Sequence, residues 1–189
     1  MDFLGIFVEN GLLYSVCYPE DQSDGQLNDI FKILFDRWAD SEYLLEFFKE
    51  NYSDLATPFW NGMTIDQAIQ QVLFEREDFE YVLWAIETKQ PEFEQKSFRD
   101  VFKPLHDNIY SLNWKNEQSR KARPDLKDSM LRIYATELED GSYVITGGAI
   151  KLTEKMIGSQ YNKEFKNLER VQEFLTTQGI FTKEGLEAL

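Results

Sequence analysis

The dipeptide Asp140-Gly141, set between two runs of alternating polar and apolar residues, constrains the fold of this chain most. MLRIYATEL (130–138) precedes it and SYVITGGAIK (142–151) follows it, and both runs are rich in residues that favour strands. Asp-Gly between two such runs is a strong signal for a two-residue hairpin turn. The sequence therefore predicts an antiparallel β-hairpin over residues 130–151.

A two-residue turn fixes the register of this hairpin. It places Arg132, Tyr134 and Lys151 on one face. Ala149 then lies directly across from Arg132, and Gly147 lies directly across from Tyr134. The small partners leave a depression beneath the two large polar side chains, and a concave face with Arg, Tyr and Lys suits an anionic ligand. The alternative is that one of the two adjacent glycines marks a β-bulge and that the basic residues are solvated.

Segments outside the hairpin show two kinds of residue pattern, one typical of strands and one typical of helices. Residues 3–18 alternate apolar runs around an Asn-Gly pair, which predicts another hairpin. Two capping-box spacings, Ser23 with Gln26 and Thr64 with Gln67, precede residues at helical intervals. The C-terminal part is expected to contain a strand at 108–114, a polar loop at 116–129, and a helix at 163–178 that ends before Gly179.

These elements predict an α+β protein of one domain, residues 1–189. We expect a small antiparallel sheet formed by a core region with a C-terminal helix, residues 101–189, together with an N-terminal strand region, residues 1–20. Residues 23–100 are expected to form a large acidic helical insertion.

Charge is distributed unevenly along the chain, which carries a formal net charge of −14. Residues 1–100 hold 21 acidic and 7 basic residues, whereas residues 101–189 hold 13 of each. An acidic surface opposes the approach of nucleic acid, although its field is screened within about 8 Å at physiological salt. We therefore expect the acidic helices to pack on the face opposite Arg132 and to leave its own face open. Their apolar residues would then meet the other side of the hairpin: Leu27, Ile30, Phe31 and Leu34 against Leu131, Ile133 and Ile150.

Cysteine content and hydropathy indicate a cytoplasmic protein without a membrane segment. Cys17 is the single cysteine, the N-terminus has no signal-peptide pattern, and no run approaches the roughly 20 apolar residues of a membrane span.

The acidic group Glu75, Glu77, Asp78 and Glu80 lacks the spacing of a calcium loop, so a solvated helix face is expected there. His106 beside Asp107 fits turn chemistry better than catalysis, and we expect no metal and no cofactor.

Four short motifs resemble the RelE superfamily of toxins, in particular its HigB and phage Gp49-like branch. They are KPL (103–105), YSL (110–112), LRIY (131–134) and GAIKLTEK (148–155), within a similarity that covers roughly residues 102–178. The resemblance implies the toxin of a type II toxin-antitoxin pair, a ribosome-dependent mRNA endoribonuclease that needs no metal. Its partners would be a helix-turn-helix antitoxin, the ribosome and mRNA.

Carried over by position, the resemblance implies catalytic roles for Arg132, Lys151 and Tyr134 in the attack of a ribose 2′-hydroxyl on the adjacent phosphate. Contacts to the RNA backbone are expected from Lys103, Lys115, Arg120, Arg123 and Lys155. The chain departs from the family pattern because Leu152 replaces the second of two lysines and because the acidic helical region is additional. The alternative is therefore a non-catalytic interaction module that uses its acidic helices to bind a basic partner.

Overall fold

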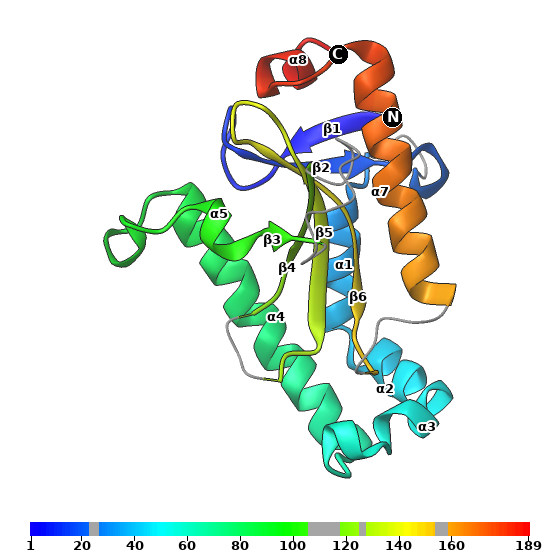
Figure 1. Cartoon of the computed structure of the whole chain (residues 1–189). Helices are drawn as coiled ribbons and strands as arrows, with labels where there is room; N and C mark the ends of the chain where they lie inside the picture. The colour runs from blue at the N-terminus through cyan, green and yellow to red at the C-terminus, as the bar shows by residue number, and fades with distance from the viewer. Residues whose placement is uncertain (23–26, 106–117, 125–127, 154–158) are drawn as a thin grey trace.

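A computed structural model describes residues 1–22, 27–105, 118–124, 128–153 and 159–189. It confirms a mixed α+β architecture, in which one sheet lies between helices on both of its faces (Figure 1). The predicted strand at 108–114 and the capping box at Ser23 and Gln26 both lie outside the described residues.

Six strands form the sheet in the order β1-β2-β6-β5-β4-β3. Neighbouring strands are antiparallel except β2 and β6, which run parallel. The expectation of a small antiparallel sheet was therefore wrong, because the first hairpin adds to the sheet through one parallel pair. The strand bounds are Asp2–Gly5 (β1), Leu13–Cys17 (β2), Lys103–Pro104 (β3), Ser119–Ala122 (β4), Leu131–Glu137 (β5) and Tyr143–Ile150 (β6).

Helices occupy most of the described chain between residues 30 and 101 and again its C-terminal end. Their bounds are Ile30–Ala39 (α1), Ser41–Glu50 (α2), Tyr52–Leu55 (α3), Ile65–Glu87 (α4), Phe98–Val101 (α5), Ser159–Gln178 (α7) and Lys183–Glu187 (α8). The predicted capping box of Thr64 and Gln67 is present at the start of α4. Gly179 ends α7 with a positive φ of 69°, as expected for a glycine that terminates a helix.

The β5–β6 hairpin has the predicted register only in the half far from its turn. Arg132 pairs with Ala149 and Tyr134 with Gly147, but the register shifts by one residue between Tyr134 and Ala135. The loop is longer than predicted, since the Leu138 N–H donates to Ser142 and Gly141 has a positive φ. The bulge compensates for this extra loop residue. Its unpaired residue is Thr146, directly before the glycine pair, so the alternative was correct about a bulge but not about its position at a glycine.

Helices α1 and α4 cover one face of the sheet and α7 covers the other (Figure 1). The first face forms the main core, in which Ile30, Phe31 and Leu34 of α1 are buried together with Leu131 and Ile133 of β5. The prediction that the N-terminal helices pack opposite the Arg132 side was therefore correct. Leu27 is an exception because half of its surface is exposed.

Residues 119–122, expected to be part of a polar loop, form strand β4 beside β5. The buried Ser119 and Ala122 flank the half-buried Arg120 and Lys121. Short polar strands of this kind are difficult to recognise from sequence because the partner strand, not an apolar pattern, stabilises them.

Candidate functional site

Arg132 does not stand over an open depression. Its side chain is only 6% exposed, and its guanidinium donates to the carbonyl oxygens of Ser129 and Leu131 at 2.9 and 2.6 Å and to the Ser129 hydroxyl at 2.9 Å. The prediction of an open face around Arg132 was wrong, because this face of the hairpin is covered by other parts of the protein. Arg132 therefore organises the chain that leads into β5.

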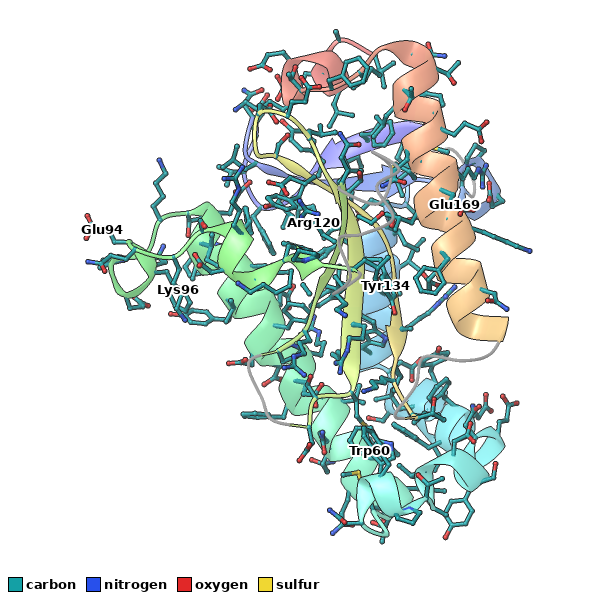
Figure 2. All side chains as sticks on the ribbon, in the orientation of Figure 1. Trp60, Glu94, Lys96, Arg120, Tyr134 and Glu169 are labelled. Atoms are coloured by element: carbon teal, nitrogen blue, oxygen red, sulfur yellow. The ribbon has the colours of Figure 1, made fainter. Side chains whose placement is uncertain are left out.

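Tyr134 and Lys151 contact different parts of the molecule. Tyr134 is fully buried on the α7 side, where it packs with Leu168 and with Phe165, whose ring centroid lies 6.1 Å away (Figure 2). Lys151 places its Nζ 4.9 Å from the centre of the Phe59 ring, at the other end of the sheet from the hairpin turn. The face that the sequence predicted to bind an anion is thus occupied by α7.

Arg132→Ala is expected to reduce the free energy of unfolding by about 2 kcal/mol, because it removes charge-assisted hydrogen bonds and leaves buried carbonyl oxygens without their donor. Arg123→Ala is the matched control, since Arg123 is exposed and its loss is expected to change stability by less than about 0.5 kcal/mol. Urea denaturation of the three proteins measures the difference. Equal midpoints for all three would contradict a structural role for Arg132.

Three of the remaining predicted RNA contacts lie at the β3–β4 edge of the sheet: Lys103 in β3, Arg120 in β4 and Arg123 directly after β4. Lys103 is exposed and donates to the Arg99 carbonyl, and Arg123 is also exposed. Arg120 forms an ion pair with the buried Glu137 at 2.6 Å. Lys115 and Lys155 lie outside the described residues.

Glu75, expected on a solvated helix face, is instead completely buried in α4. Its carboxylate accepts hydrogen bonds from the main-chain N–H groups of Met130 and Leu131 at 2.8–2.9 Å. Burial raises the pKa of Glu75, while these donors act in the opposite direction. The contact joins α4 to the start of β5 and is structural.

Among the described residues, no group of acidic, His or Cys side chains could hold a metal ion.

A cleft of about 260 Å³ lies where β2 and β6 separate. The two strands pair only as far as Ser15 and Ile145, so the edge of β6 beyond that point faces the space between α1 and α7. Tyr18 follows β2 at this point and donates its hydroxyl to the Thr146 carbonyl at 2.7 Å. The sheet therefore supplies the floor of a cleft whose walls are two helices.

The adjacent glycines of β6 allow both walls to approach. A Cβ atom at Gly148 would lie 2.8 Å from Leu34 and 3.0 Å from Trp38, both on α1. A Cβ atom at Gly147 would lie only 1.8 Å from an oxygen of Glu164 on α7. The glycine pair therefore admits α1 on one face and a carboxylate on the other.

Glu164 is a buried carboxyl in the lining of the cleft. It is 7% exposed, and its Oε2 has no hydrogen-bond partner among the described residues. Burial raises the pKa of this carboxyl to about 7, even though Lys163, the Gly148 N–H and Arg37 favour its charged form. A carboxyl that titrates near neutral pH inside a cleft is suited to accept and donate protons.

Cationic and aromatic groups surround this carboxyl. Arg37 of α1 and Lys163 of α7 line the cleft together with the rings of Tyr18, Trp38 and Tyr43. The acidic Glu20 and Asp21 also line it. The Glu20 carboxylate is paired with Arg170, whose guanidinium lies 5.2 Å from the centre of the Tyr18 ring. Tyr18 and Trp38 are only 3% and 2% exposed, so the groups that can reach a ligand are the two cations, which suit a phosphate.

Sequence reasoning found the glycine pair but not the residues that fill it. The sequence patterns place Glu164 in a C-terminal helix and Arg37 in an acidic region, and they mark neither as a functional residue. The available signal was the pair of glycines itself, because two adjacent strand positions without side chains indicate close approach on both faces.

Comparisons with known proteins give no family assignment: no protein-family model, curated protein or solved structure matches this chain. Within the described residues, no helix combines the length and the apolar character needed to cross a membrane.

Proposed function

We propose that this protein is a metal-independent RNA endonuclease whose active centre is the cleft between α1, β6 and α7. The single observation that carries the proposal is the buried Glu164 carboxyl, whose pKa burial raises to about 7 in a cleft that Arg37 and Lys163 also line. Its Oε2 lies against Gly147, so the proton would be accepted by Oε1 or after the side chain turns toward the cleft. Arg37 and Lys163 flank it with the positive charge that a phosphodiester requires. Arg132, Tyr134 and Lys151 are not part of this proposed centre.

The reaction follows from these groups. The Glu164 carboxylate accepts the proton of a ribose 2′-hydroxyl, and the 2′-oxygen forms a bond to the adjacent phosphorus. The bond from phosphorus to the 5′-oxygen breaks, and the leaving oxygen takes a proton from the Lys163 ammonium. Arg37 stabilises the charge that develops on the phosphoryl oxygens. The products are a 2′,3′-cyclic phosphate and a 5′-hydroxyl end.

The wider proposal keeps the partners that the RelE-like motifs imply. The protein would act in the cytoplasm as the toxin of a toxin-antitoxin pair, on mRNA bound to the ribosome, and a helix-turn-helix antitoxin would hold it inactive. The RelE-like core and the acidic helical insertion belong to this same proposal. Support for these partners comes from the sequence motifs alone, whereas the cleavage chemistry is supported by the cleft.

The test compares two substrates. Purified protein is incubated with an RNA, both free and as mRNA on ribosomes, and the cleavage position is mapped. The same RNA with a 2′-deoxy sugar at that position is expected to resist cleavage completely, because the attacking hydroxyl is gone. Products with 2′,3′-cyclic phosphate ends are expected. Cleavage of the deoxy substrate, or intact RNA under both conditions, would overturn the proposal.

A further inference from the structure

A stripe of exposed aromatic side chains runs along α4 on the surface away from the sheet. Phe74, Tyr81 and Trp84 are 60%, 45% and 37% exposed. Their spacing places them on one side of the helix, with the exposed Glu77 between the first two. Helix α4 forms one side of the molecule, remote from α7 (Figure 1).

The stripe is extended by the segment that follows α4. The Phe93 ring lies 6.0 Å from Tyr81, and Tyr81 itself lies 5.8 Å from Trp84. The Tyr81 hydroxyl donates to Glu92 at 2.6 Å, which fixes this ring toward the segment. Three rings from two separate segments therefore form one apolar surface. We call Phe74, Tyr81, Trp84 and Phe93 the α4 stripe.

Carboxylates border the α4 stripe. Glu77 and Asp78 lie beside it on α4, and Glu92 and Glu94 lie on the following segment, which projects from the molecule (Figure 2). The basic residue within this part of α4, Arg76, is drawn inward: it pairs with Glu80 at 3.0 Å and lies 5.7 Å from the Phe35 ring.

Two lysines lie at the C-terminal end of the stripe. Lys89 is exposed, and Lys96 places its Nζ 5.1 Å from the centre of the Phe93 ring. The middle of the stripe, around Glu77 and Asp78, is consequently its most acidic part.

We infer that the α4 stripe binds a basic amphipathic helix of a partner protein. Aromatic residues spaced at three and seven positions present a seam that a second helix can occupy, with apolar side chains against the rings. Lysines or arginines beside that seam would face Glu77, Asp78 and Glu92. A second copy of this chain fits poorly, because each copy carries a net charge of −14 and the surface would meet its own carboxylates. The inference is independent of the proposed RNA cleavage.

The test uses a synthetic amphipathic peptide of leucine and lysine in heptad positions, a peptide of the same composition in scrambled order, and a leucine-glutamate version. Binding is followed by Trp fluorescence and by calorimetry. The leucine-lysine peptide is expected to bind at least about tenfold more tightly than either other peptide, with affinity that falls as salt is raised. Tyr81→Ala and Glu77→Gln/Asp78→Asn are each expected to weaken binding about tenfold.

Leu27→Ser is the control, because Leu27 is an exposed apolar residue outside the stripe, and its affinity is expected to equal that of the unchanged protein. Equal binding of all three peptides would overturn the inference, as would full affinity of Tyr81→Ala. A self-associated state that Phe74→Ser converts to monomer would identify a second copy as the occupant and would also overturn it.

Discussion

Glu164→Gln is expected to lower the rate of RNA cleavage by about 10²–10⁴-fold, the contribution typical of a general base. Glutamine has nearly the same shape as glutamate, so the cleft keeps its form while the proton acceptor is lost. Glu169→Gln is the matched control: Glu169 is on the same helix but exposed, away from the sheet (Figure 2), and its substitution is expected to leave the rate unchanged.

The pH dependence tests the same group. Cleavage needs the deprotonated Glu164, whose pKa burial raises to about 7, so the rate of the unchanged protein is expected to rise through pH 7 and to level off above it. That rise should be absent from the residual activity of Glu164→Gln. A rise of the same midpoint in both proteins would remove Glu164 from the mechanism.

Stability separates this role from a structural one. A carboxyl whose pKa is higher in the folded than in the unfolded protein makes the folded state less stable as pH rises from its ordinary value to its raised one. The neutral Glu164→Gln side chain avoids this cost, so at pH 8 this variant is expected to unfold at the same urea concentration as the unchanged protein or a higher one. A clear loss of stability at pH 8 would indicate that Glu164 serves packing.

Gly148→Ala is expected to reduce the free energy of unfolding by roughly 1–3 kcal/mol, the range for a core that is overfilled. The new Cβ atom would lie 2.8 Å from the carbonyl oxygen of Arg132 and 2.8 Å from Leu34. The carbonyl belongs to the neighbouring strand and α1 is packed against the core, so neither can move away freely. Urea denaturation measures the change.

Gly147→Ala provides the comparison within the same strand. Its Cβ atom would meet only the end of the Glu164 side chain, which can turn away. We expect stability to change by less than about 1 kcal/mol and cleavage to fall as in Glu164→Gln, because the carboxylate is displaced. The reverse pattern, with Gly147→Ala unstable but active and Gly148→Ala unaffected, would contradict the separate roles assigned to the two glycines.

Local sequence rules located most of the elements, because their causes are local. Asp140-Gly141 determined that residues 130–151 form a hairpin, and Thr64 with Gln67 determined where α4 begins. Gly179 determined the end of α7. Each of these signals acts through backbone dihedral angles or a hydrogen bond to a residue a few positions away, so it is present in the sequence itself.

Tertiary structure alone decided the burial of the predicted site. Arg132 and Tyr134 do lie on the same side of β5, as the strand period requires, but α7 covers that side. The sequence cannot reveal which face helix α7 will occupy, because both faces of this hairpin offer apolar contacts. The prediction that Arg132 and Tyr134 lie on an open surface was therefore wrong, because polar residues on a strand can also be buried beneath a helix.

The candidate cleft has the same origin. The adjacent Gly147 and Gly148 were visible in the sequence, but Glu164 follows on another element, and Arg37 lies more than a hundred positions before them. Only the parting of β2 from β6 and the packing of α1 and α7 bring these groups together. The raised pKa of Glu164 has no local cause either, since it arises from exclusion of water by residues distant in sequence. The sequence determined the position of the β5–β6 hairpin, the cap of α4 and the end of α7, whereas long-range packing determined strand β4, the parallel β2–β6 pair and which side chains remain available for chemistry.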